Sequence, residues 1–110
     1  MIKQTDHRRA LEKIAANPSK YGFENTIAIA MEVNLFDKTG RQVAQPDLVL
    51  YDTKGEITIV EYKNNGDQAL IERAQEQLYN AVDWFSKNTG ISPKMALIDG
   101  TRYPELRRIR

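Results

Sequence analysis

The segment QPDLVLY at residues 45–51, followed after a short turn by ITIVEYK at residues 57–63, decides the fold of this chain. The first segment has an apolar run at residues 48–51, and the second is rich in β-branched side chains, which is typical of strands. The turn between them, residues 52–55, begins with an aspartate and ends with a glycine, as hairpin turns commonly do. We therefore predict two antiparallel strands, over residues 42–51 and 56–62.

The turn also predicts the register of this strand pair. If residues 53–55 form a three-residue loop, Gly55 supplies the left-handed conformation that such a loop needs. Asp52 then pairs with Glu56, and each step back along one strand matches one step forward along the other. A register shifted by a single residue would turn every side chain to the opposite face of the sheet.

The predicted register brings two carboxylates together at the far end of the strands. Asp47 lies directly opposite Glu61, and Lys63 shares the face of Glu61 because side chains alternate along a strand. Like charges in opposed positions destabilise a sheet unless a cation neutralises them. Oxygen ligands favour Mg²⁺ or Mn²⁺, beside which Lys63 would orient a water or stabilise charge on phosphorus. The alternative is an ordinary solvated strand end, with Lys63 as a surface salt-bridge partner.

The rest of the chain supplies the elements around this hairpin. Hydrophobic spacing predicts helices over residues 3–16 and 67–88, and strands over residues 26–36 and 94–98. A helix joins the last two strands, so these are most simply parallel. We therefore predict a single α/β domain over residues 1–110, in the order α-β-β-β-α-β, with a mixed sheet flanked by helices.

Composition narrows the chemistry that the chain can perform. It has 110 residues, no cysteine and one histidine, which excludes disulfides, thiolate zinc sites, cysteine nucleophiles and sites built from several histidines. His7 lies near the chain end and argues against a Ser-His-Asp triad, so catalysis must rely on carboxylates and lysines. The sequence predicts neither a signal peptide nor an apolar segment of membrane-spanning length. We expect a cytoplasmic protein that needs no organic cofactor.

Charge is distributed unevenly along the chain. The 16 Lys+Arg and 15 Asp+Glu give a formal net charge of +1, but basic residues gather at both ends and acidic residues in the middle. Basic ends suit a polyanionic partner, whose phosphates they would bind with little sequence preference. The alternative is a solvated surface. The candidate phosphate-binding residues are Lys3, Arg8, Arg9, Lys13, Arg102, Arg107, Arg108 and Arg110.

The sequence Pro46-Asp47 on one predicted strand and Glu61-Tyr62-Lys63 on the next resembles the motif of the PD-(D/E)XK nuclease superfamily. The predicted order of elements also resembles the core of that superfamily, which includes restriction endonucleases and Holliday-junction resolvases. The resemblance implies metal-dependent phosphodiester hydrolysis. It implies that Asp47, Glu61 and the main-chain carbonyl of Tyr62 bind Mg²⁺ or Mn²⁺, and that Lys63 is the catalytic lysine.

The superfamily commonly adds two further side chains to this motif. For an acidic residue on the first helix, Glu12 is the best match and Glu24 the second, although either would also suit solvent. For a glutamine on the helix after the lysine, Gln77 is the match, because it lies within the apolar stripe where a polar group needs a partner. Gln77 would also be satisfied by the backbone. Gln75 and Tyr79 match a related pattern, but their helical phase places them outside the stripe.

These expectations describe a Mg²⁺-dependent DNA endonuclease, of a junction-resolving, repair or restriction type. A homodimer would bring two such sites to two DNA strands. DNA versus RNA, and endonuclease versus exonuclease, stay open at this point. The alternative is a catalytically inactive nucleic-acid-binding or interaction module with the same fold.

Overall fold

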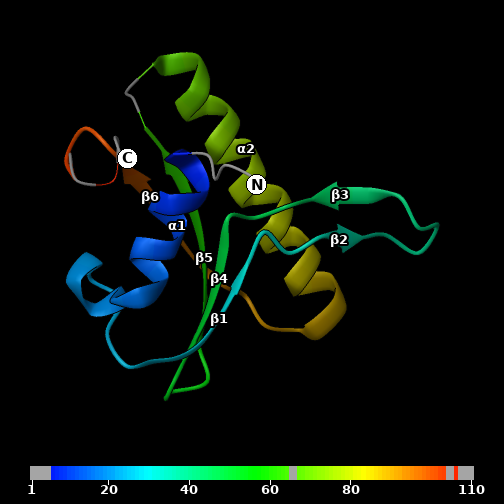
Figure 1. Ribbon diagram of the computed structural model, residues 1–110. Helices are drawn as coiled ribbons and strands as arrows, with labels where there is room; N and C mark the ends of the chain where they lie inside the picture. The colour runs from blue at the N-terminus through cyan, green and yellow to red at the C-terminus, as the bar shows by residue number, and fades with distance from the viewer. Residues whose placement is uncertain (1–5, 65–66, 104–105, 107–110) are drawn as a thin grey trace, which may run out of the picture.

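Two helices cover opposite faces of a four-stranded sheet in the computed structural model, which describes residues 6–64, 67–103 and 106 (Figure 1). These two helices are α1 (Asp6–Ala16) and α2 (Gln68–Thr89), and a short 3-10 helix, η1 (Pro18–Tyr21), follows α1. The strands are β1 (Thr26–Met31), β2 (Leu35–Phe36), β3 (Gln42–Ala44), β4 (Leu48–Asp52), β5 (Ile57–Lys63) and β6 (Lys94–Asp99). Within the described residues, no helix combines the length and apolar character that a membrane crossing requires.

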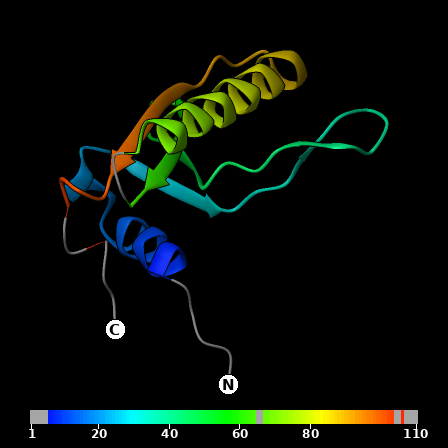
Figure 2. The ribbon, with the colours of Figure 1, turned by 90° about the horizontal axis from the view of Figure 1, so that it is seen from above.

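The sheet is mixed, as the sequence predicted. Its strand order is β1-β4-β5-β6, with antiparallel pairing from β1 to β5 and parallel pairing between β5 and β6. The parallel pair follows from the crossover through α2, which returns the chain to the same end of the sheet. Figure 2 shows α1 on one side of the sheet and α2 on the other. The predicted α/β architecture is therefore confirmed.

The predicted register of the β4–β5 hairpin is also confirmed. Tyr51 pairs with Ile57 and Val49 with Ile59, and Gly55 adopts a φ of 79° in the turn. The last pair of the ladder, Leu48 with Val60, lies one residue inside the carboxylates. Continued by one step, this register places residue 47 opposite residue 61.

The prediction of two long strands, over residues 26–36 and 42–51, is wrong in one respect: each strand is interrupted in its middle. Glu32 follows β1 with a φ of 51°, and Pro46, which has no backbone N–H, separates β3 from β4. Beyond this break β2 and β3 pair with each other in a separate two-stranded sheet. We call residues 35–44 the hairpin arm. The arm leaves the main sheet (Figure 1) and is held to α2 by Trp84, whose Nε1 donates to the carbonyl of Phe36 at 2.8 Å.

The core is divided by the sheet into two clusters. On the α1 side, Leu11 and Ile14 pack with Val60 and Tyr62. On the α2 side, the buried residues are Leu35, Ala44, Ile59, Leu78 and Ala81. Because side chains alternate along β5, Glu61 continues the row of Ile59 and faces α2. A carboxylate thus follows the row of apolar side chains on this face of β5. The candidate site lies at this end of the row.

Candidate active site

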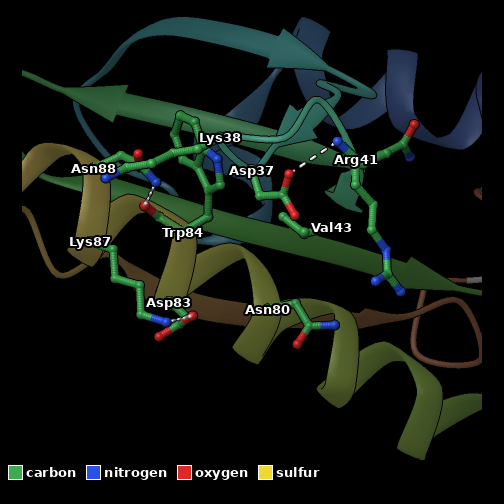
Figure 3. Close-up of a pocket in the computed structure, with 10 residues that line it drawn as sticks. Asp37, Lys38, Arg41, Val43, Asn80, Asp83, Trp84, Lys87 and Asn88 are labelled. Atoms are coloured by element: carbon green, nitrogen blue, oxygen red, sulfur yellow. Dashed lines mark hydrogen bonds and ion pairs between the residues drawn. The ribbon is translucent and has the colours of Figure 1, made fainter.

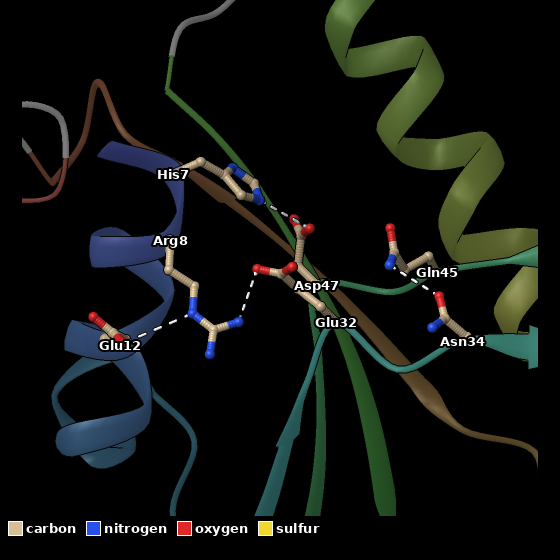
Figure 4. A network of polar contacts seen from close by, with 7 residues as sticks. All are labelled: His7, Arg8, Glu12, Glu32, Asn34, Gln45 and Asp47. Atoms are coloured by element: carbon tan, nitrogen blue, oxygen red, sulfur yellow. Dashed lines mark hydrogen bonds and ion pairs between the residues drawn. The ribbon is translucent and has the colours of Figure 1, made fainter. Parts of the chain in front are cut away.

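Asp47 is held in place by contacts from α1 and from the neighbouring strand β5. It follows Pro46 and lies one residue before β4, and only 9% of its surface is exposed. Nε2 of His7 lies 3.1 Å from Oδ1 of Asp47, and the backbone N–H of Tyr62 donates to Oδ2 at 2.7 Å. Figure 4 shows His7 reaching from the first turn of α1 to this carboxylate. Both oxygens of Asp47 are therefore fixed by the fold.

Glu61 is the more deeply buried partner of this carboxylate pair. Its surface is 3% exposed, and its Oε1 has no hydrogen-bond partner. A buried polar atom without a partner costs about 1–3 kcal/mol. Such a cost is expected at a position where the fold leaves an oxygen free for a ligand.

The two carboxyl groups share one proton. Burial raises the pKa of Glu61 to about 9, and the hydrogen bond to Asp47 and the negative charge of that residue act in the same direction. Burial also works to raise the pKa of Asp47, but hydrogen bonds from His7, Glu61 and the Tyr62 N–H outweigh it and lower the pKa below its ordinary value. At neutral pH Asp47 is thus ionised and Glu61 carries the proton.

His7 is the site residue that the sequence reasoning missed. Its hydrogen bond to Asp47 outweighs the effect of burial and raises the pKa of the imidazole above 6.5. Its ring lies 5.8 Å from that of Tyr62, centroid to centroid. Helical periodicity could have indicated that His7 faces the sheet, because His7 precedes the buried Leu11 and Ile14 by four and seven residues on the same stripe of α1.

A cavity of about 410 Å³ opens over the carboxylate pair and is lined by Asp47, Glu61, Lys63, Arg73, Gln77 and residues 42–45. Its walls come from β3, β5 and α2. Three predicted residues, Glu61, Lys63 and Gln77, are thus brought together with Asp47. Arg73 was not predicted. It lies four residues before Gln77 on the same face of α2, and it forms no ion pair among the residues that the structure describes. We call this hollow the active-site cavity.

Glu12 lies outside the active-site cavity. Its Oε2 is 3.7 Å from Nε of Arg8, and Nη1 of Arg8 is 3.2 Å from Oε1 of Glu32. Figure 4 shows Glu12 farther along α1 than His7, with Arg8 between it and Glu32. The structure thus places His7, rather than Glu12, next to Asp47, because the first turn of α1 lies over that end of the sheet. A direct role for Glu12 in the site stays a prediction.

Glu24 lies at the opposite end of the sheet. It lines a separate cavity of about 340 Å³ together with Asp52 and Glu56. Gln75 and Tyr79 line a third hollow, against β6, on another side of α2 from Gln77. The phase argument that placed this pair outside the apolar stripe agrees with that location.

The predicted phosphate-binding residues are only partly described by the structure. Arg8, Arg9 and Lys13 lie on α1, and Arg102 follows β6. Arg8 is engaged by two carboxylates, as described above. Lys3, Arg107, Arg108 and Arg110 lie outside the described residues. Binding of nucleic acid by the basic ends stays a prediction.

The donor set of the carboxylate pair fits a hard divalent cation. In the parts of the chain that the structure describes, no group of three or more His, Cys, Asp or Glu side chains is arranged to hold a metal ion. Mg²⁺, however, is commonly bound through one or two carboxylates and keeps several waters. An ionised Asp47 beside the free Oε1 of Glu61 meets that requirement. The Tyr62 carbonyl as a third ligand stays a prediction.

Comparison with known proteins gives one informative likeness. No family model matches the chain, and no curated protein matches it in sequence. The crystal structure of a repair endonuclease from Pyrococcus abyssi is similar, with a TM-score of 0.62 and 20% sequence identity. The alignment covers 96% of this chain and 44% of the endonuclease chain. The chain therefore shares its fold with a part of that protein that is less than half its length.

Proposed function

We propose that this chain is a metal-dependent nuclease of the PD-(D/E)XK type that hydrolyses phosphodiester bonds in DNA. The observation that carries the proposal is the buried carboxylate pair, in which Oε1 of Glu61 has no partner while Lys63 and Gln77 line the same cavity. The shared fold with a repair endonuclease supports a nuclease-type activity and favours a repair role.

Asp47 and Glu61, with the Tyr62 carbonyl, would hold Mg²⁺ or Mn²⁺. The bound ion would supply positive charge at the scissile phosphate and lower the pKa of a water molecule. Asp47 is already ionised, and its hydrogen bonds from His7 and Tyr62 keep it oriented. Glu61, whose pKa is raised by burial and by the neighbouring Asp47, would bind the ion in its ionised form and release its proton to solvent.

The other residues of the cavity act on the substrate. Lys63 is half-buried beside Glu61, where its ammonium group would hold the attacking water or stabilise negative charge on the phosphoryl oxygens. The amide of Gln77 would hydrogen-bond to that water or to a phosphate oxygen. Arg73 presents a guanidinium group, which binds phosphate oxygens in a bidentate manner. A homodimer would apply two such sites to two strands.

The second candidate is a catalytically inactive nucleic-acid-binding module with the same fold. The observation that favours it is that Arg8 neutralises Glu12, which leaves two carboxylates over the site.

Cleavage assays separate the two candidates. Wild type, Lys63→Ala and Lys54→Ala are incubated with branched, duplex and single-stranded DNA, and with RNA, in Mg²⁺, Mn²⁺ or EDTA. Lys54 is the matched control, because it is an exposed lysine in the β4–β5 turn at the other end of the sheet. We expect metal-dependent products from wild type and Lys54→Ala but not from Lys63→Ala. Absence of cutting on every substrate, together with a DNA shift on a native gel, would favour the inactive module.

A further inference from the structure

A second and larger cavity lies between the hairpin arm and α2, away from the carboxylate pair (Figure 3). Its volume is about 680 Å³, within the range of about 300–1,000 Å³ that is usual for ligand sites. The arm contributes Lys38 and Arg41 to its lining, and α2 contributes Asn80, Trp84 and Lys87. We call it the arm cavity.

The arm cavity adjoins the active-site cavity. Gln42 and Val43 of β3 line both hollows, so the same short strand forms a wall of each. Figure 3 shows Arg41 extending from the arm toward α2 on the side of Asn80, whereas Asp83 and Lys87 lie farther along the helix. An extended ligand that occupies the active-site cavity therefore has a path along β3 into the arm cavity.

The acidic groups of the arm cavity are already satisfied. Oδ1 of Asp37 accepts hydrogen bonds from the N–H groups of Thr39 and Arg41, at 2.9 and 3.1 Å, and so closes the turn of the arm. Asp83 pairs with Lys87 at 3.0 Å. The negative charge that lines the cavity is thus largely committed to the fold.

The basic groups of the arm are available, by contrast. Neither Lys38 nor Arg41 forms an ion pair with a residue that the structure describes, and both are exposed. Together with Arg73 and Lys63 in the adjoining cavity, they place four basic side chains along one path. Spaced positive charges on a path that ends at a phosphodiesterase site are complementary to a polynucleotide backbone.

We propose that the hairpin arm binds a single strand of nucleic acid next to the bond to be cut, with the arm cavity holding the neighbouring nucleotides. This inference rests on the proposed nuclease function. A single strand is the occupant that fits, because the arm cavity has a volume of about 680 Å³ between the arm and one helix, which is too small for the two backbones of a duplex. Lys38 and Arg41 contact phosphates and do not read sequence.

The chain contains its own reporter for this proposal. Trp84 is the only tryptophan and it lines the arm cavity, so its fluorescence reports occupancy independently of cleavage. The probe is a short thymidine oligonucleotide, titrated in EDTA into the Lys63→Ala protein so that it is not cut. A duplex of the same length and a dinucleotide are titrated in parallel. We expect the oligonucleotide to change the emission of Trp84, and the dinucleotide and the duplex to do so far less.

Arg41→Gln tests the contact itself. Loss of one phosphate contact should weaken oligonucleotide binding several-fold and reduce the salt slope of log K by about 1. The variant should fold normally, because the backbone N–H of Arg41, and not its side chain, caps Asp37. Lys54→Gln is the matched control. The N–H of Gly55 donates to the carbonyl of Asp52 at 3.0 Å, as the N–H of Gly40 does to the carbonyl of Asp37 in the arm. The turn that carries Lys54 lies at the other end of the sheet. We expect Lys54→Gln to bind as the Lys63→Ala parent does.

The outcomes separate this proposal from the nuclease function. If wild type cuts DNA but Trp84 emission does not respond, or Arg41→Gln behaves like Lys54→Gln, the arm proposal is overturned and the nuclease stands. If the duplex binds as tightly as the single strand, the assignment of a single strand is overturned. If Trp84 responds and Arg41 matters but no substrate is cut, the arm is supported as a binding surface and the nuclease fails.

Discussion

The β4–β5 hairpin carries an aspartate and a glutamate at each of its ends, and the two pairs behave in opposite ways. At the turn, both Lys54 N–H and Glu56 N–H donate to Oδ1 of Asp52 at 2.9 Å, while Glu56 pairs with Nζ of Lys94 at 2.6 Å. Each carboxylate of this turn pair has its own partner. At the other end, Asp47 takes the donors, and Oε1 of Glu61 is buried without one.

The difference shows that residue type does not decide which pair is a site. The turn pair is half-buried and each of its carboxylates has a local partner, so it contributes to folding of the turn. The carboxylate pair is buried, shares a proton and leaves one oxygen without a partner, which suits the cation that we propose for it. Matched substitutions in the two pairs test this contrast.

The largest expected difference is in cleavage. Asp47→Asn should lower the cleavage rate at least about 100-fold, because a bound metal ion supplies several kcal/mol of charge stabilisation in the transition state. Asp52→Asn should cleave at close to the wild-type rate when assayed well below its melting temperature. Initial rates on the preferred substrate measure both. Equal rates for the two variants would remove the distinction between the pairs.

The pH dependence of stability should also separate the pairs. The pKa of Glu61 is raised in the folded protein, so folding is favoured by its proton, and this contribution is lost as pH rises from about 4.5 toward about 9. One proton corresponds to a loss of up to about 1.4 kcal/mol per pH unit. Glu61→Gln should remove this loss and Glu56→Gln should keep it, in urea unfolding without metal. A wild-type curve parallel to that of Glu61→Gln would contradict the shared proton.

Metal should stabilise the protein through the carboxylate pair alone. At about ten times its Kd, Mg²⁺ should add roughly 1.4 kcal/mol to the free energy of unfolding and raise the Tm by roughly 5 °C. Glu61→Gln should lessen this response, and Glu56→Gln should respond as wild type does. Differential scanning fluorimetry with increasing Mg²⁺ measures the shift. A full response from Glu61→Gln would place the ion elsewhere.

The smallest expected difference concerns the basic partners of the two pairs. His7→Ala removes the contact with Oδ1 of Asp47 and should cost about 1 kcal/mol, because that carboxylate is largely buried. Lys94→Ala removes an exposed ion pair and should leave the free energy of unfolding unchanged within error. Chemical denaturation of both variants at neutral pH measures the contrast. An equal loss in both would show that burial does not set the strength of these contacts.

The sequence was sufficient for the register because the signal was local. The aspartate and glycine of the 52–55 turn define the loop, and strand alternation then carries the register to Asp47 and Glu61. Helical phase placed Gln77 within the apolar stripe and left open whether it reached the site, and the structure places it in the lining of the active-site cavity. Local periodicity therefore predicted the central part of the candidate site.

The remaining features depend on contacts between distant segments. The apolar pattern continues through residues 33–35, so it gave no sign that Glu32 would leave the strand and donate its N–H to the Asp47 carbonyl at 2.9 Å. His7 and Asp47 are separated by 40 residues, and no local pattern states which turn of α1 lies over that strand end. Arg73 is exposed on α2 and lies outside the hydrophobic stripe, so the periodicity of apolar residues could not indicate its position in the site.

The break at Glu32 and Pro46 has a consequence for how the fold can be altered. The hairpin arm and the main sheet are separate hydrogen-bonded units joined by two short connections, so lengthening the arm by pairs of residues does not shift the β4–β5 register. New chain ends placed in the arm turn by circular permutation would likewise fall in an exposed turn. The tip of the arm can therefore be altered while the carboxylate pair keeps its geometry.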